Sequence, residues 1–326
     1  MKNIKKIYYL MSFFLFLALT NPVLASAQNV PKRRPATFLG FLLSPKFIIM
    51  LIIAAFVLIL LLTKKMKNKI KVPLLLLSTF LFGIAANIPV KIFTSFAMHP
   101  SPMCAVTKSI LYGFRIPMIV TLTIILILTL LGPKLFCGWI CPVGTLQELI
   151  AMLADKLKIK RIKWNFTVSQ AIRLGIFILF IFLSGTAILN LTQNGRIFAV
   201  SLYDYINAFH GFEFILQKSL LDNIINFLPF ILTVVLSFKL YRPFCYLVCP
   251  MGILTQLIEQ IALFRVSLKR PPCDDCGVCE KKAPCPTVPD ILKNATLRPD
   301  CFSCNICVES CPKNAMEFGI KKTLSG

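Results

Sequence analysis

Histidine, tryptophan and acidic residues are scarce in this chain of 326 residues. Its two histidines, His99 and His210, fall in connections between apolar segments, whereas a relay of b-type haems needs histidine ligands on facing membrane helices. The sequence also has no Cys-x-x-Cys-His haem attachment site and no glycine-rich dinucleotide or phosphate-loop pattern. These absences exclude a haem relay and argue against nicotinamide oxidation by this chain.

Basic residues, by contrast, are abundant: there are 36 lysines and arginines against 13 acidic residues, a net charge of +23. A charge of this size can indicate a nucleic-acid-binding surface. Here, however, the basic residues cluster in short segments between apolar runs, which is the pattern that sets membrane topology. Because 57% of the residues are hydrophobic and the mean hydropathy is +0.77, the composition indicates a membrane protein with no nucleic acid partner.

The N-terminal residues 1–27 have the pattern of a secretory signal peptide. A basic start is followed by an apolar stretch over residues 7–19 and by a small-residue cleavage site, Ala25-Ser26-Ala27. An uncleaved first membrane helix is the alternative interpretation. Both interpretations place the residues that follow outside the cytoplasm.

Five further membrane spans are predicted within a membrane domain over residues 28–260. They are expected near residues 47–62, 72–92, 116–131, 171–191 and 224–241. About 17–20 apolar helical residues cross a bilayer core of about 30 Å. Basic residues concentrate in the loops at 63–71 and 132–170 and after residue 241, which places these loops and the C-terminus in the cytoplasm. We therefore expect an α-helical multi-pass bundle in the lipid of the bacterial cytoplasmic (inner) membrane, with Trp139 and Trp164 as interfacial anchors.

An internal repeat links the two halves of this domain. The pattern Phe-Cys-x3-Cys-Pro-x-Gly occurs at residues 136–144 and again at 244–252, here called the first and second CxxxCP segments. Each copy follows an apolar span that enters the cytoplasm and leads into an amphipathic stretch. Two related halves are therefore expected to present equivalent cysteine pairs at the same membrane face. The four residues, here called the four-cysteine site, are Cys137, Cys141, Cys245 and Cys249.

The chemistry of the four-cysteine site stays open at the level of sequence. Cysteines four apart share one face of a helix, or the proline after the second cysteine places that cysteine at a helix N-cap, where the thiol pKa is lowered. Four thiolates are enough for a third iron–sulfur cluster, for two redox-active dithiols or for a transiently bound metal ion. Buried cysteine used as a small apolar residue is the structural alternative, and the repetition of the whole motif argues against it.

The C-terminal segment at residues 265–320, here called the tail, carries eight further cysteines in two ordered runs. Their spacing is Cys-x2-Cys-x2-Cys-x5-Cys-Pro followed by Cys-x2-Cys-x2-Cys-x3-Cys-Pro. Three thiolates two residues apart wrap one face of a cubane, and in two-cluster ferredoxins the fourth ligand comes from the other run. We therefore expect a small cytoplasmic α+β ferredoxin-like domain that binds two [4Fe–4S] clusters.

The expected ligand sets follow from this exchange of the fourth cysteine between the runs. The first tail group is Cys273, Cys276, Cys279 and Cys311. The second tail group is Cys301, Cys304, Cys307 and Cys285. Tetrathiolate zinc is the alternative, but zinc sites usually contain two separated Cys-x2-Cys pairs. Because so small a domain has little core of its own, the clusters are expected to stabilise its fold.

A connection expected outside the membrane, residues 93–115, brings together residue types that suit copper. They are Met98, His99, Met103 and Cys104. Methionine also occurs by chance in proline-rich connections, and the second half of such a site is not evident. Cys104 has no expected disulfide partner.

Paired CxxxCP segments at the ends of membrane spans, followed by a two-cluster tail, resemble the NapH/NosR/CcoG-type family of membrane polyferredoxins. The resemblance covers about residues 70–318. It implies electron transfer between the quinol pool or cytoplasmic donors and a partner redox protein, often a periplasmic reductase or its assembly system. We expect a NapH-like core, without the large periplasmic flavin-binding domain of NosR-like members or the extra C-terminal domain of CcoG-like members.

The function expected from these features is that of an electron-transfer component and not of a stand-alone enzyme. Quinol or a soluble donor would reduce the chain, and its clusters would pass single electrons to a partner redox complex, so quinone is a candidate further cofactor. One alternative is a cupric reductase or oxidase-assembly factor that acts through the four-cysteine site. Another is a membrane regulator whose clusters sense the redox state.

Overall fold

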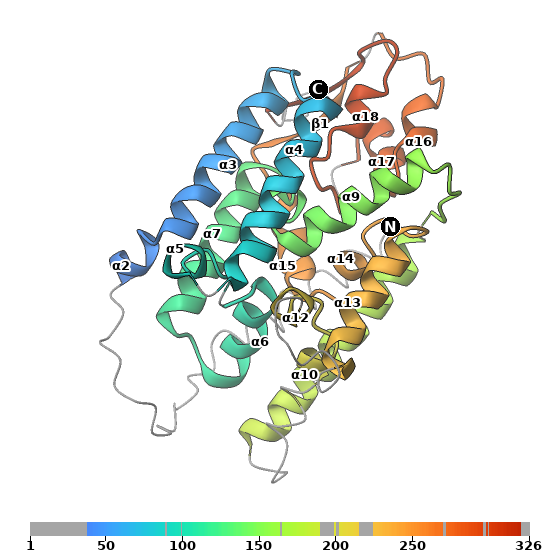
Figure 1. Cartoon of the computed structure of the whole chain (residues 1–326). Coiled ribbons are helices and arrows are strands. Elements are labelled where there is room, and N and C mark those ends of the chain that lie inside the picture. The colour runs from blue at the N-terminus through green and yellow to red at the C-terminus, as the bar shows by residue number, and fades with distance from the viewer. Residues whose placement is uncertain are drawn as a thin grey trace.

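The structure, a computed structural model, is mostly helical (Figure 1). It describes residues 38–320 except 89, 99, 164, 190–198, 200–201, 215–223, 270–271, 296–297 and 299. The expected signal peptide or first helix at residues 1–27 therefore lies outside the described residues.

Three helical stretches are long and apolar enough to cross a membrane. They are α3 (Pro45–Leu62), the stretch Asn68–Asn87 that begins with α4 (Asn68–Thr79), and α10 (Phe166–Ile188). A rise of about 1.5 Å per residue gives the 18 residues of α3 a length of about 27 Å. Less than half of each stretch is buried inside the protein, so each presents an apolar face to lipid as well as one to the core.

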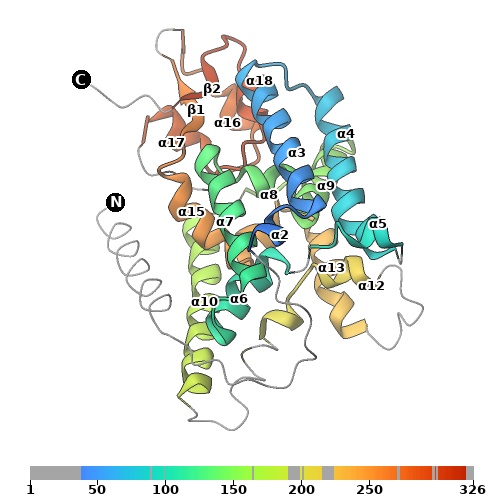
Figure 2. The same cartoon turned by 90° about the vertical axis from the view of Figure 1, so that its left-hand side faces the viewer.

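Two further apolar helices, α7 (Ile116–Leu131) and α13 (Ile224–Ser237), are shorter. The 16 residues of α7 extend about 24 Å, which is less than the bilayer core of about 30 Å. In both views these helices run within one bundle with α3, α4 and α10 (Figures 1 and 2). That they cross the membrane, as the five-span topology requires, stays a prediction.

Each of the shorter apolar helices leads into a helix pair that contains a CxxxCP segment. These pairs are α8 (Leu135–Trp139) with α9 (Pro142–Lys156), and α14 (Pro243–Leu247) with α15 (Met251–Glu259). Lys134 and Arg242, the residues before α8 and α14, both have a left-handed backbone, with φ of 45° and 50°. The backbone therefore makes the same left-handed turn before each CxxxCP segment.

The tail folds at one end of the bundle (Figures 1 and 2). Its elements are β1 (Phe264–Leu268), α16 (Val278–Lys282), α17 (Val288–Leu292), α18 (Ile306–Glu309) and β2 (Met316–Ile320). The two strands form an antiparallel sheet in which Phe264 lies opposite Ile320 and Leu268 opposite Met316. This sheet joins the beginning of the tail to its end and so closes the chain around the two cysteine runs.

After α4, the stretch to Asn87 continues as a π-helical turn (Phe80–Ile84) and a 3-10 turn (Ala85–Asn87). Four further short helices are described. They are α2 (Phe38–Leu42), α5 (Lys91–Thr94), α6 (Pro102–Tyr112) and α12 (His210–Phe214). They lie away from the tail in both views (Figures 1 and 2). The connections expected outside the cytoplasm and the tail thus occupy different ends of the molecule.

Loops expected in the cytoplasm meet the tail at its end of the bundle. Lys64, after α3, pairs with Glu317 of β2 at 3.5 Å. Lys163, after α9, donates to the carbonyl of Glu280 in α16 at 2.7 Å. The basic loops and the tail therefore lie on the same side of the molecule.

The Glu148 carboxylate of α9 is buried between two cations. It contacts Lys71 of α4 at 2.6 Å and Arg242 at 3.0 Å, and it accepts a hydrogen bond from the Tyr241 hydroxyl at 2.6 Å. Burial alone would raise the pKa of Glu148, but the charges of Lys71 and Arg242 outweigh burial and hold this pKa well below its usual range. The carboxylate is therefore ionised at neutral pH and joins α4, α9 and the turn before α14.

The Asp300 carboxylate has the corresponding position in the tail. It pairs with Lys134, before α8, and with Arg173 of α10, the latter at 2.9 Å. All three side chains are fully buried. The Asp300 carbonyl also accepts from the Tyr246 hydroxyl of α14 at 3.2 Å. One tail residue thus contacts both CxxxCP helix pairs and α10, which holds the tail against the membrane domain.

Glu148→Gln should destabilise the fold strongly, because it leaves Lys71 and Arg242 buried without their counter-charge. Removing one partner of a buried ion pair typically costs about 3–5 kcal/mol. Thermal unfolding in detergent measures the change. Glu317→Gln is the control, since Glu317 pairs with Lys64 and Lys269, both half-exposed, and each such surface pair is worth at most about 1 kcal/mol. Equal Tm values for Glu148→Gln and the wild type would contradict the role of this carboxylate.

The same carboxylate makes stability depend on pH. Because the pKa of Glu148 is lowered in the folded state, its contribution is present at neutral pH and is lost as the pH falls below the unfolded value of about 4.3. The wild type should therefore lose more stability over that acid range than Glu148→Gln does.

Candidate redox sites

The first tail group surrounds one cavity. The cysteines that line it are Cys273, Cys276, Cys279 and Cys311, the four expected to share a cluster. Positive φ values at Asp275 (54°) and Gly277 (69°) turn the chain on either side of Cys276. Cys276 itself is exposed, so this group reaches the molecular surface.

The second tail group also comes together. Its members are Cys285, Cys301, Cys304 and Cys307. Burial raises the pKa of Cys307, and the neighbouring Cys285, Cys304 and Cys301 raise it further, so the four thiols lie within electrostatic reach of one another. Ser303 and Asn305, on either side of Cys304, have positive φ values of 50° and 66°. The backbone therefore makes the same turn in both runs.

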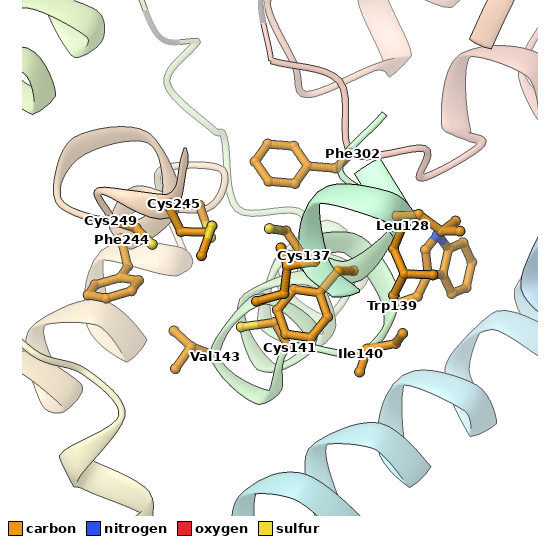
Figure 3. Packing of buried hydrophobic residues seen from close by; sticks show 14 of the residues in the cluster. Leu128, Cys137, Trp139, Ile140, Cys141, Val143, Phe244, Cys245, Cys249 and Phe302 are labelled. Atoms are coloured by element: carbon orange, nitrogen blue, oxygen red, sulfur yellow. The ribbon is translucent and has the colours of Figure 1, made fainter. Parts of the chain in front are cut away.

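The four-cysteine site lies inside the protein. All four residues line one cavity, and each is only 7–9% exposed. Figure 3 shows the side chains of Cys137 and Cys141 on one helix pair and those of Cys245 and Cys249 on the other, with their sulfur atoms toward the space between. The four cysteines are thus buried within the bundle and do not lie at its surface.

Two helices begin at the four-cysteine site. Cys141 is the N-cap of α9 and Pro142 its first residue, whereas α15 begins at Met251. Burial raises the pKa of Cys141 well above its usual range and that of Cys249 to about 12, and backbone N–H groups in the first turn of each helix oppose this shift. Since these N–H groups and the helix dipole favour negative charge, the N-cap interpretation of the motif describes the first copy.

Gln147 of α9 adds a contact between the two copies. Its side-chain amide donates to the Cys245 sulfur at 3.4 Å and accepts from the Phe244 N–H at 3.0 Å. Three of the four sulfur atoms thus accept hydrogen bonds from N–H groups. Cys245 accepts from Gln147, and Cys141 and Cys249 accept from the first turns of α9 and α15. Hydrogen bonds to a ligand sulfur stabilise its negative charge and tune a bound metal centre.

The glycine of each Cys-Pro-x-Gly sequence is required by close packing. A Cβ on Gly144 would collide with the Cys137 carbonyl oxygen. In the second copy, a Cβ on Gly252 would lie 3.0 Å from the Cys245 carbonyl oxygen and 2.5 Å from Arg173 Nη1. Glycine thus lets the first turn of the helix pack directly on the backbone of the first cysteine.

Two buried cations, Lys134 and Arg242, were not predicted as site residues. They occupy equivalent positions, three residues before the first cysteine of each copy. Lys134 lines the cavity and donates to the Gly252 carbonyl at 3.1 Å. Arg242 donates to the Cys137 carbonyl at 2.9 Å. Each cation thus contacts the opposite copy. A basic residue at the same place in both repeats is the signal by which sequence could have found them.

Trp139 does not act as the predicted interfacial anchor. It is 1% exposed, and its indole N–H donates to the Ser303 carbonyl at 3.2 Å. Ser303 in turn donates to the Pro133 carbonyl at 2.7 Å. Trp139 therefore joins the first CxxxCP segment to the second tail group. Trp164 lies outside the described residues.

The four-cysteine cavity is lined from both ends of the bundle. Phe302, which follows Cys301 in the tail, lines it with its ring centroid 4.5 Å from the Arg242 guanidinium carbon (Figure 3). Pro102 of α6 and Phe209 line the same cavity, and both belong to connections expected outside the cytoplasm. The site therefore lies between the two ends and not at either of them.

The first tail group and the four-cysteine site have a geometry that suits iron–sulfur clusters. Within the part of the chain that the structure describes, no three histidine, cysteine or acidic side chains converge tightly enough to hold a single metal ion. The first tail group and the four-cysteine site instead line cavities, as a cubane with separate iron corners requires. At the four-cysteine site, N–H donors and buried cations suit an anionic thiolate group.

The connection considered for copper is described in part. Met98 and Met103 are buried, with 9% and 1% exposure, and the Cys104 N–H donates to the Ser101 hydroxyl that caps α6. His99 lies outside the described residues. The copper site therefore stays a prediction.

Comparison with known proteins finds a matching family model and several relatives. A family model described as a 4Fe-4S binding domain matches the chain twice, at residues 114–160 and 223–271, and thus at both CxxxCP segments. Ferredoxin-type protein NapH of Haemophilus influenzae is 26% identical over 167 residues, which are 49% of this chain and 51% of NapH. The chain is therefore similar to ferredoxin-type proteins of the NapH/NosR type.

Two further relatives match longer stretches of the chain. YccM of Escherichia coli is 27% identical over 202 residues, 60% of this chain and 54% of YccM. Methylamine utilization ferredoxin-type protein MauN of Methylorubrum extorquens is 28% identical over 213 residues, 61% of this chain and 66% of MauN. The match thus spans between about half and two thirds of these relatives' length. No solved structure matches the chain.

Gly144→Ala should damage the four-cysteine site, because the added methyl group meets the Cys137 carbonyl. Overpacking of this kind costs about 1–3 kcal/mol, and it should lower both the Tm in detergent and the iron content. Gly175→Ala in α10 is the matched control, since nothing lies within 4 Å of its Cβ position and alanine is about 0.5–1 kcal/mol better than glycine within a helix. Identical behaviour of the two variants would contradict the packing explanation.

Proposed function

We propose that this iron–sulfur electron-transfer protein carries single electrons between its tail and the interior of its membrane domain by means of three [4Fe–4S] clusters. The two tail groups would each hold one cluster and the four-cysteine site the third. The observation that carries the proposal is the sequence of contacts between the three groups. Cys276 of the first tail group is exposed. Cys279 of the first tail group lies within electrostatic reach of Cys307 of the second. Phe302 of the tail lines the four-cysteine cavity.

Each bound [4Fe–4S] cluster would supply a one-electron couple. The residues of the chain would provide thiolate ligands, orient the groups and exclude water. At the four-cysteine site, Gln147 and the first turns of α9 and α15 donate N–H groups to sulfur, and Phe302 closes the cavity toward the tail. This division of roles agrees with a protein that tunes redox centres and performs no bond chemistry of its own.

We propose in addition that the membrane domain is built from two related halves, which run from α4 to α9 and from α10 to α15. In the first half, Lys71 of α4 contacts Glu148 at 2.6 Å. In the second half, Arg173 of α10 contacts Gln256 at 2.7 Å. Glu148 and Gln256 each follow the CxxxCP glycine by four residues. In both halves, a basic residue of the first helix thus contacts the side chain that lies four residues after the CxxxCP glycine.

The tail, proposed to be an α+β ferredoxin-like unit, would face the cytoplasm from the cytoplasmic membrane. The basic loops that meet the tail support this orientation, because lysine and arginine are retained on the cytoplasmic side. A cytoplasmic donor would then exchange electrons at the exposed edge of the first tail group. Quinol is the alternative donor, and a partner redox complex would be the acceptor.

A cupric reductase that uses the four thiols directly has less support. Each of these cysteines is at most 9% exposed, and Phe302 and Pro102 close their cavity from two sides. A hydrated cupric ion would reach them only after the tail had moved away. A redox-sensing regulator would use the same clusters, and it would differ from the proposed conduit by showing no steady-state electron transfer.

Anaerobically purified protein should contain about twelve irons per chain, four for each cubane. The double variant Cys141→Ser/Cys249→Ser should lose about four of them and keep the EPR signals of the tail, because its substitutions lie outside both tail groups. Iron analysis together with EPR measures both outcomes.

Cys104→Ser is the matched control for this double variant and should leave the iron content unchanged. About eight irons in the wild type would refute the third cluster and return the four-cysteine site to dithiol chemistry or a structural role. Two or fewer irons with stoichiometric zinc would refute the clusters in the tail as well.

A further inference from the structure

Positive charge is in excess around the four-cysteine cavity, where four buried cations share two buried carboxylates. The contacts are those of Glu148 with Lys71 and Arg242 and of Asp300 with Lys134 and Arg173. Among the described residues this leaves two cations in excess of the carboxylates, or one if the buried Glu259 nearby is counted as ionised. Because an uncompensated buried charge is strongly unfavourable, this region requires a further anion.

The excess charge lies against the four-cysteine site. Lys134 lines the cavity, Arg242 donates to the Cys137 carbonyl at 2.9 Å and Arg173 to the Cys245 carbonyl at 3.0 Å. The N-termini of α9 and α15 add their positive dipole ends. Four thiolates on a [4Fe–4S] cluster carry two negative charges when it is oxidised and three when it is reduced. A cluster at this site would therefore provide the missing counter-charge.

The cations beside the two tail groups are more exposed than those at the four-cysteine site. Two exposed aspartates and Glu280 flank the first group, and so do the exposed Lys281, Lys282 and Lys313. At the second group, the Glu259 carboxyl accepts from the Cys301 N–H at 3.4 Å, and the nearby Lys71 is already paired with Glu148. Arg265 and Arg298 also line a cavity with Cys301, but Arg265 is 8% exposed and Arg298 partly exposed. Lys134, Arg173 and Arg242 at the four-cysteine site are fully buried, so water screens their charge less.

We propose that Lys134 and Arg242 raise the reduction potential of the four-cysteine site above that of both tail groups, so that electrons run from the tail into the membrane domain. This inference rests on the proposed function, which places a cluster at that site. Reduction adds one negative charge, and buried cations stabilise the reduced state more than the oxidised one. One electron leaves a tail cluster, which is oxidised, and arrives at the four-cysteine cluster, which is reduced; no bond or proton is exchanged.

The backbone of the two residues supports a role beyond packing. A left-handed conformation costs a residue with a side chain about 1–2 kcal/mol, and both Lys134 and Arg242 adopt it at equivalent positions. Such strain persists where the surrounding structure enforces it, commonly at functional sites. Here it directs one buried cation from each copy to the backbone of the opposite copy.

The test is an EPR-monitored redox titration of the anaerobically purified full chain and its variants. The double variant Cys141→Ser/Cys249→Ser assigns the four-cysteine signal by its loss. In the wild type this signal should be the first to appear on reduction. Lys134→Gln removes the charge but can still donate to the Gly252 carbonyl, and it should disfavour reduction at the site about tenfold relative to the tail, which is about 59 mV for one electron.

Two controls separate charge from structure. Lys134→Arg keeps the charge and should keep the wild-type potential, since the equivalent residue, Arg242, already adopts the same backbone conformation. Lys64→Gln, at the surface, should leave all potentials unchanged.

A four-cysteine signal that appears after the tail signals in the wild type overturns the inference, and so does a Lys134→Gln midpoint equal to that of the wild type. If Lys134→Gln cannot be purified, the wild-type order of potentials decides alone. The iron content shows whether the proposed direction of electron flow or the proposed third cluster is wrong. About twelve irons with the wrong order refutes only the direction of flow, whereas about eight irons without a third signal refutes the third cluster itself.

Discussion

The rest of this structure depends on the sharing of two buried carboxylates, Glu148 and Asp300, among four buried cations. A buried charge needs a partner, and losing one member of such a pair is strongly destabilising. Asp300 belongs to the tail, while Lys134 and Arg173 belong to the membrane domain. The tail therefore cannot separate without leaving these two cations unpaired in the interior. It forms part of the core of this end of the molecule and is more than an appended domain.

The same arrangement places the cysteine groups in contact. Asp300 directly precedes Cys301, and Phe302 directly follows it, so the ion pairs that hold Asp300 also hold the Phe302 ring over the four-cysteine cavity. Trp139 adds a second link from the first CxxxCP segment to the tail. Connections from the opposite end, at Pro102 and Phe209, reach the same cavity. A single buried site thus adjoins both ends of the bundle, as an electron path across a membrane would require.

Much of the site could be predicted because cysteine spacing acts locally. The turns at Asp275 and Gly277 and at Ser303 and Asn305 bring the cysteines of each run together within a few residues, and the crossing of the fourth ligand follows from a known pattern. Burial could not be predicted in this way. Tryptophan is common at membrane interfaces, so Trp139 was expected there. It is buried instead by its contact with Ser303, which is far from it in the chain. The depth of the four-cysteine site likewise depends on Pro102 and Phe302, which no local pattern connects to it.

Sequence by itself determined the candidate redox residues and the membrane pattern. It supplied the grouping of the tail cysteines, the two CxxxCP segments, and the apolar stretches with basic loops on one side. These features are encoded by spacing and by hydrophobicity, which act over neighbouring residues. Only the tertiary structure decided that the two segments face each other across one cavity and that Lys134, Arg242, Glu148 and Asp300 surround it. Charges are buried together only when distant elements pack, and their pairing depends on that packing and not on their order in the chain.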